Sequence, residues 1–164
     1  VLGYFYVAMP LGVLNAFATI TSRTEGSEWV LMMIFIFIWL NDTGAYLVGS
    51  QIGRHRLFER LSPKKSWEGF FGGLLFCVVA GICAAMFVHS VVGWWQWIVT
   101  SVLACVMATL GDLFESLMKR TLGVKDSGNL IPGHGGILDR IDSLLFVGPA
   151  VSLFLILFVY YNIL

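Results

Sequence analysis

Three aspartates stand at positions where they could hold a metal ion and a phosphorylated ligand together. Asp112 follows an apolar run that ends at Leu110, and Asp139 and Asp142 are three residues apart, so a helix would place both of their carboxylates on one face. Carboxylates alone repel phosphates, but a hard divalent cation such as Mg²⁺ takes carboxylate and phosphate oxygens as joint ligands. These residues therefore predict metal-assisted phosphoryl or nucleotidyl transfer.

Basic and hydroxyl side chains accompany Asp112. If its helix continues, Ser116 and Lys119 share its face and Glu115 lies close beside them. A solvated helix face has a similar composition, but Asp112 is the first charge after a membrane-length apolar run. We therefore interpret this face as part of a binding site.

The glycine-rich stretch between the two groups of aspartates predicts an anion-binding loop. Glycine lets the backbone approach a ligand closely, and successive backbone N–H groups can form a concave anion site. The spacing G-x-x-x-x-G-K-[ST] of a nucleotide-binding P-loop does not occur, which excludes that class of site. The glycines of this stretch are Gly128, Gly133, Gly135 and Gly136.

Two earlier stretches carry charges of the same kind. Asp42 follows an unbroken apolar run near the end of an expected membrane helix, where an unpartnered carboxylate is costly. Ser62 and Pro63 resemble a helix start, with Ser62 as N-cap and Pro63 in the first helical position. Lys64 and Lys65 would then lie in the first turn, where cations oppose the helix dipole unless an anion such as a phosphate binds there.

The elements that must position these side chains are membrane helices. Of the 164 residues, 58% are hydrophobic and 12% charged, with a mean hydropathy of +0.85, which is far more apolar than a soluble domain. A hydrocarbon core of about 30 Å needs roughly 20 apolar residues per helix. No apolar run alternates with a period of two, so we expect an all-α, polytopic membrane protein rather than a β-barrel. The five expected helices are residues 1–20, 29–48, 69–88, 94–117 and 143–164.

The formal net charge of zero hides a sorting of the basic residues. They fall almost entirely in two polar segments, between the second and third expected helices and between the fourth and fifth. The positive-inside rule places both segments in the cytoplasm. We therefore expect a multi-pass protein of the cytoplasmic membrane with its site facing the cytoplasm. The same rule gives a simpler interpretation of Lys64 and Lys65, as ordinary cytoplasmic lysines.

One membrane domain, residues 1–164, accounts for the sequence, because it holds no internal repeat and no soluble linker. Gly69 and Gly73 are four residues apart on the third expected helix, and Gly81 and Ala85 repeat this spacing. Small residues four apart predict close packing against a neighbouring helix, and they require no functional role.

Taken together, the polar residues resemble the signature of the phosphatidate cytidylyltransferase family. That signature is a serine, then Lys-Arg, then Lys-Asp after four residues, then a Pro-x-His-Gly-Gly stretch that closes in Asp-Arg-x-Asp. Here it reads Ser116-Leu117-Met118-Lys119-Arg120, Lys125-Asp126, Pro132-Gly133-His134-Gly135-Gly136 and Asp139-Arg140-Ile141-Asp142. The resemblance reaches back to Asp42-Thr43-Gly44-Ala45-Tyr46, Ser62-Pro63-Lys64-Lys65-Ser66-Trp67-Glu68-Gly69 and Gly111-Asp112.

The resemblance implies a reaction and its partners. CTP and phosphatidic acid would become CDP-diacylglycerol and pyrophosphate in phospholipid synthesis, with Mg²⁺ as cofactor and room for a second metal ion. The expected partners are CTP, phosphatidic acid, the lipid bilayer and a second copy of the chain in a homodimer, with no nucleic acid. Family members begin with further membrane helices, so we expect residues upstream of this chain.

Residue roles follow from the resemblance together with the chemistry of each side chain. Metal binding is expected from Asp112, Asp139, Asp142 and Asp42. Catalysis is expected from Asp112, Asp139, Lys119, Arg120, Lys125, His134 and Arg140. Substrate binding is expected from Lys64, Lys65, Ser66, Ser116, Asp126, Gly133, Gly135 and Gly136.

Two other activities fit parts of the sequence. A CTP-dependent lipid kinase, such as a polyprenol kinase, would use related chemistry but would release CDP rather than pyrophosphate. An ion-coupled transporter would explain carboxylates inside membrane helices. The transporter leaves the cluster of lysines, arginines and glycines unexplained, and it predicts acids nearer the middle of the bilayer.

Overall fold

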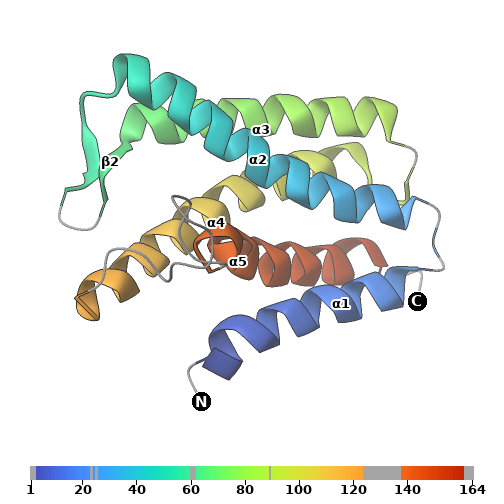
Figure 1. Ribbon diagram of the computed structural model, residues 1–164. Coiled ribbons are helices and arrows are strands. Elements are labelled where there is room, and N and C mark those ends of the chain that lie inside the picture. The colour runs from blue at the N-terminus through green and yellow to red at the C-terminus, as the bar shows by residue number, and fades with distance from the viewer. Residues whose placement is uncertain are drawn as a thin grey trace.

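Helices dominate this computed structural model, which describes residues 3–22, 24, 26–59, 62–88, 90–123 and 138–160 (Figure 1). The side chains at positions 63, 138–140 and 160 lie outside the described part. Five helices of the described residues are long and apolar enough to cross a membrane. The expectation of an all-α, polytopic membrane protein is therefore confirmed.

The five spans lie where the apolar runs predict them, with longer polar ends. The first joins a π-helical turn, η1 (Tyr4–Ala8), to α1 (Met9–Thr21). The others are α2 (Ser27–Ile52), α3 (Trp67–Phe87), α4 (Trp94–Thr121) and α5 (Leu138–Leu155), which continues as the π-helical turn η2 (Ile156–Tyr160). α2 and α4 run past their predicted ends at 48 and 117, and α5 begins before 143. Hydropathy marks only the apolar part of a helix, so it misses these polar turns.

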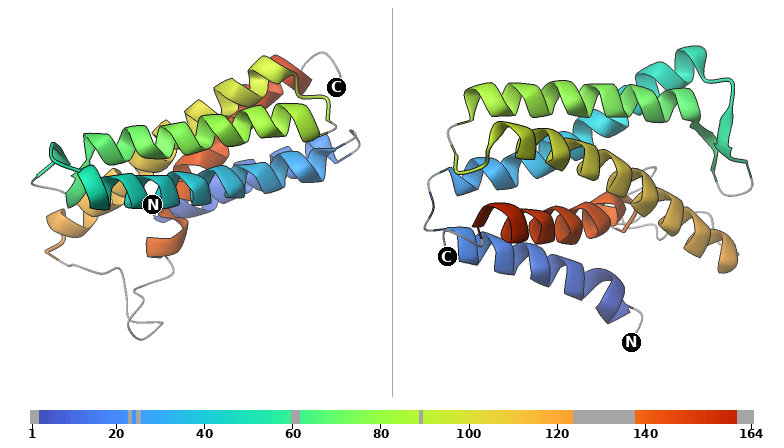
Figure 2. Two further views of the ribbon diagram at one scale, coloured as in Figure 1. Left: turned by 90° about the horizontal axis from the view of Figure 1, so that it is seen from above. Right: turned by 180° about the vertical axis from the view of Figure 1, so that it is seen from behind.

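The helices form two pairs with α4 between them. Figure 1 shows α2 beside α3 at the top, α1 beside α5 at the bottom, and α4 crossing between the pairs. The second view of Figure 2 shows that α3 begins and α4 ends at the same end of the molecule, next to the short hairpin. The polar ends of four helices, α2 to α5, therefore converge there. The buried core between them includes Phe17, Ile34, Phe37, Trp97, Ala104, Val147 and Val151.

Glycines let α2 and α3 pack backbone to backbone, as the small-residue spacing predicts. A Cβ atom on Gly73 would lie 2.8 Å from the backbone oxygen of Asn41, and one on Gly69 would lie 2.9 Å from that of Ala45. On Gly72 it would lie 2.5 Å from the Cβ of Val48. Real Cβ contacts are not this short, so any larger residue must push the helices apart.

A two-stranded antiparallel hairpin, rather than a helix start, carries Lys64 and Lys65. Its strands are β1 (Arg56–Phe58) and β2 (Ser62–Ser66), with Arg56 opposite Ser66. The prediction of Ser62 as N-cap is wrong. Ser62 precedes a proline, which disfavours helical backbone and favours extended structure.

The N-cap of α3 is Ser66, which is not followed by a proline as Ser62 is. Its backbone is extended (φ −124°, ψ 157°), and its side chain accepts a hydrogen bond from the backbone N–H of Gly69 at 3.1 Å. Lys64 and Lys65 therefore precede the helix and do not oppose its dipole from within the first turn. The acidic residue of that first turn, Glu68, has the favourable sign for a helix N-terminus.

Replacing Gly72 by alanine should destabilise the protein by about 1–3 kcal/mol, because the new methyl group overlaps Val48. A matched control is Gly12→Ala on α1, where a Cβ would meet nothing within 4 Å. Thermal unfolding of both variants in the same detergent gives the comparison. Equal melting temperatures for the two variants would contradict the packing described here.

Candidate functional site

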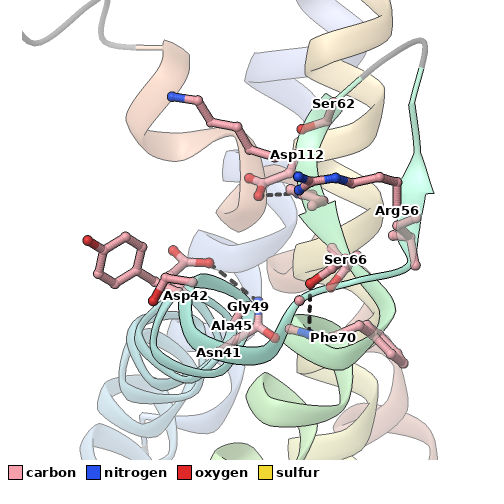
Figure 3. Close-up of a pocket in the computed structure, with 17 residues that line it drawn as sticks. Asn41, Asp42, Ala45, Gly49, Arg56, Ser62, Ser66, Phe70 and Asp112 are labelled. Carbon is pink, nitrogen blue, oxygen red and sulfur yellow. Dashed lines mark hydrogen bonds and ion pairs between the residues drawn. The ribbon is translucent and has the colours of Figure 1, made fainter.

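A cavity of about 600 Å³ lies at the hairpin end of the molecule (Figure 3). It is bounded by α2, the hairpin, the start of α3 and the second half of α4. Polar side chains from α2, the hairpin and α4 line it. They are Asn41, Asp42, Tyr46 and Ser50 of α2, Arg56, Ser62, Lys64, Lys65 and Ser66 of the hairpin, and Thr109 and Asp112 of α4. Gly69 and Phe70 line it at the start of α3, and Gly49 and Gly53 line it at the end of α2. Both signs of charge thus meet in one cavity large enough for a small-molecule ligand.

An ion pair between Lys65 and Asp112 joins the hairpin to α4. The Nζ of Lys65 donates to Oδ2 of Asp112, and both side chains are about three-quarters buried. The hydroxyl of Ser143 donates to the other oxygen, Oδ1, at 3.0 Å. Asp112 is therefore held from two directions, by the hairpin on one side and α5 on the other.

Gly111 explains why α5 can approach Asp112 so closely. A Cβ at this position would lie 2.8 Å from the backbone oxygen of Asp142 and 3.1 Å from the Cα of Ser143. Only glycine allows that contact without moving α5. Gly111 thus lets α5 come close enough for Ser143 to donate its hydrogen bond to Asp112.

Three carboxyl groups gather where α4 meets the start of α5. The carboxyl group of Asp142 interacts with those of Asp112 and Glu115, and it also accepts a hydrogen bond from the backbone N–H of Ser143 at 2.6 Å. Glu115 is almost fully buried and pairs with Lys119 at 3.0 Å, one helical turn away. Adjacent carboxylates repel one another unless a proton or a cation lies between them.

These carboxylates fit a hard divalent cation by donor type, since all of their donor atoms are carboxylate oxygens. Within the described residues, however, no group of three or more His, Cys, Asp and Glu side chains has the arrangement of a metal site. Lys65 already occupies one oxygen of Asp112. The side chain of Asp139, a predicted ligand, lies outside the described part, so metal binding stays a prediction.

The α2 wall of the cavity places Asp42 beside a buried amide. Asn41 is 4% exposed, and its Nδ2 donates to Oδ1 of Asp42 at 3.4 Å (Figure 3). The tight contact of Gly73 with Asn41 fixes this part of α2. Asp42 lines the same cavity as Asp112, and the metal-binding role expected of both stays a prediction.

The structure brings some of the predicted site residues together and separates others. The cavity collects Asp42, Lys64, Lys65, Ser66 and Asp112. Ser66 also has the structural role of capping α3. Lys119 pairs along its own helix with Glu115, and neither Ser116 nor Arg120 lines this cavity.

Several of the predicted site residues belong to the glycine-rich loop. Lys125, Asp126, Gly133, His134, Gly135 and Gly136 lie outside the described residues. Asp139 and Arg140 belong to the first turn of α5, but their side chains lie outside the described part as well. Their predicted roles stay predictions.

Sequence reasoning missed Arg56, Asn41 and Thr109 as cavity residues. Arg56 is one of several basic residues that the positive-inside rule already explains. Only its pairing with Ser66 in the hairpin places it at the cavity. Asn41 carried a usable signal, because it is an amide inside a membrane-length apolar run. Thr109 carried none, since threonine is common on membrane helices.

Comparison with known proteins identifies relatives over most of the chain. A model of the cytidylyltransferase family matches residues 1–158. A Staphylococcus epidermidis protein named phosphatidate cytidylyltransferase is 44% identical over 135 residues, which is 82% of this chain and 52% of the relative. A Staphylococcus haemolyticus protein of the same name is 42% identical over 146 residues, or 89% of this chain and 55% of the relative. The chain spans about half the length of the curated relatives it matches.

Replacing Lys65 by methionine should destabilise the protein by roughly 1–3 kcal/mol, because Asp112 keeps its charge and loses its cation in a mostly buried position. Lys64→Met is the matched control, since Lys64 is exposed and has no ion pair among the described residues. Adding Asp112→Asn to Lys65→Met should recover part of the loss. Thermal unfolding of the single and double variants measures this coupling, and additive effects would contradict the ion pair.

Proposed function

Because this chain belongs to the cytidylyltransferase family, we propose that its protein makes CDP-diacylglycerol and pyrophosphate from CTP and phosphatidic acid. The observation that carries the proposal is the cavity in which hairpin cations face Asp112 at the ends of membrane helices. A membrane-embedded frame suits a lipid substrate, and a polar cavity at the helix ends suits a nucleotide. The names of the relatives agree with this assignment.

The proposed reaction is one displacement at phosphorus. A phosphate oxygen of phosphatidic acid attacks the α-phosphorus of CTP, and the bond from that phosphorus to the oxygen bridging to the β-phosphate breaks. Pyrophosphate leaves with the electron pair of that bond. The attacking oxygen is already anionic, so no side chain has to remove a proton, and catalysis rests on positioning and charge stabilisation.

The hairpin supplies the cations for that charge. Arg56, Lys64 and Lys65 line the cavity from one side, so the β- and γ-phosphates of CTP can bind against them. Further phosphate contacts are proposed for the other cations of the predicted site, which are Lys119, Arg120, Lys125, His134 and Arg140. Charge stabilisation of the leaving group by such cations is a large term in phosphoryl transfer.

Asp112, with Asp42, Asp139 and Asp142, is proposed to hold Mg²⁺, and a second metal ion would draw on the same carboxylates. Bound Mg²⁺ would neutralise phosphate charge at the reacting centre. The close approach of Asp142 to Asp112 and Glu115 requires a proton or a cation among them, and Mg²⁺ would take the place of that proton. The hydrogen bond from Ser143 orients Asp112 for such a role.

The membrane orientation and the assembly are also proposals. The described cations lie at the hairpin end: Arg54 precedes β1, Arg56, Lys64 and Lys65 are on the hairpin, and Lys119 and Arg120 are in the last turn of α4. By the positive-inside rule that end faces the cytoplasm, where CTP is available. We propose the cytoplasmic membrane as the location and a homodimer as the assembly.

The full-length protein, purified in detergent and supplied with phosphatidic acid, labelled CTP and Mg²⁺, should form labelled CDP-diacylglycerol and release pyrophosphate. Chelation with EDTA should stop the reaction, and added Mg²⁺ should restore it. Release of CDP together with a phosphorylated lipid alcohol would instead identify a lipid kinase. Absence of any metal-dependent CDP-lipid would reject the proposed function.

Asp112→Asn and Asp139→Asn should each lower kcat at least about 100-fold, because each removes charge from the reacting centre. Glu28→Gln is the control, since Glu28 is exposed at the opposite end of α2. Size in detergent and melting temperature should be recorded for each variant, since Asp112 also pairs with Lys65. Wild-type activity in both aspartate variants would rule out the proposed metal ligands.

A further inference from the structure

The carboxyl group of Glu68 binds the foot of the hairpin, which is the pair Arg54 and His55 just before β1. Its Oε2 accepts a hydrogen bond from the backbone N–H of Arg54 at 3.2 Å, and both of its oxygens lie 3.2 Å from the backbone nitrogen of His55. The ring Nδ1 of His55 lies 2.6 Å from Oε1. One carboxylate thus binds three donors from two consecutive residues, just before β1 begins.

Glu68 is well placed to transmit the position of α3 to the hairpin. It lies in the first turn of α3, directly after the residues that pair with β1. The backbone N–H of Trp67 donates to the carbonyl oxygen of His55 at 2.9 Å, which adds a second contact at the same point. The side chain of Glu68 is 22% exposed and does not line the cavity. It can therefore act on a cavity ligand through the hairpin, but not by direct contact.

The hairpin needs such an anchor because its own pairing is short. β1 has three residues and β2 has five, and the register shifts between Arg56 and Phe58. A two-stranded hairpin of this kind is at best marginally stable in water without packing against other elements. The Lys65 to Asp112 ion pair fastens it on the cavity side, and the Glu68 contacts fasten it at the foot.

We propose that Glu68 is a positioning residue that holds Arg56, Lys64 and Lys65 of the hairpin at the cavity. The identity of the ligand phosphates as those of CTP rests on the proposed function, but the anchoring itself does not. Without the Glu68 carboxylate, the backbone N–H groups of Arg54 and His55 lose their acceptor. The three cations would then spread over more positions, and fewer of them would face the cavity at once.

Hydrogen–deuterium exchange of the full-length protein in detergent tests the anchoring without any activity. Glu68→Gln keeps the size of the side chain but removes its charge, and Glu68→Ala removes all three contacts. Peptides that cover residues 53–66 should exchange roughly threefold to tenfold faster in Glu68→Ala, with Glu68→Gln between it and wild type. Glu59→Ala is the matched control, because it removes an exposed carboxylate from the other end of β1. Unchanged exchange in Glu68→Ala would overturn the proposal.

Steady-state kinetics tests the link to the ligand. In both Glu68 variants the KM for CTP should rise roughly threefold to tenfold while kcat changes by less than twofold, because the hairpin cations bind phosphates before the reaction as well as during it. A merely destabilised protein would lose active molecules, and would show a lower kcat with an unchanged KM. That pattern, or a KM like that of Glu59→Ala, would overturn the positioning role. If wild type makes no CDP-lipid, the proposed function fails, while the exchange experiment still decides the anchoring.

Discussion

The ion pair between Lys65 and Asp112 is the contact on which the polar end of this protein depends. It joins the hairpin between α2 and α3 to α4, and so adds an ionic contact to the helix packing of this part of the bundle. Each charge is costly near the membrane without the other. Gly111 and Ser143 hold Asp112 in place, while Glu68 and Trp67 hold the hairpin that carries Lys65. Two walls of the cavity, the hairpin and α4, are therefore held together by opposite charges, and neighbouring residues fix each of these charges in position.

Apolar length was sufficient to predict the five membrane helices, since a hydrocarbon core dictates both their length and their helical form. Asp42 and Asp112 were found for the same reason, as charges that such helices do not normally carry. The hairpin was missed because its strands are short, and their stability comes from pairing and anchoring that a single sequence does not display. Ser62 was predicted as an N-cap because serine followed by proline often begins a helix. In the structure the extended backbone that a residue before proline prefers decides instead, and Ser62 begins β2. The pairing of Lys119 with Glu115 is an ordinary helical contact between residues four apart.

The arrangement of charges also bears on the competing activities. In a transporter, carboxylates serve as ion sites near the middle of the bilayer, away from cations that would compete for them. Here Asp42 and Asp112 lie in the halves of α2 and α4 nearest the hairpin, and Arg56, Lys64 and Lys65 line the same cavity. Such mixed charge suits a ligand that is itself anionic and that can accept hydrogen bonds from several cations. It favours transfer chemistry on phosphates over ion transport.

The lengths of α2 and α4 determine how deep in the bilayer this chemistry would occur. With 26 and 28 residues at about 1.5 Å each, they are roughly 39 and 42 Å long, about 10 Å more than the hydrocarbon core requires. If the apolar part of each helix fills the hydrocarbon core, the polar excess at the hairpin end places Asp112 close to the boundary between acyl chains and headgroups. A phosphate attached directly to a membrane lipid sits at that depth. Such a lipid would meet the cavity by lateral diffusion within its own leaflet, with its tails still in the hydrocarbon, while a water-soluble nucleotide arrives from the aqueous side.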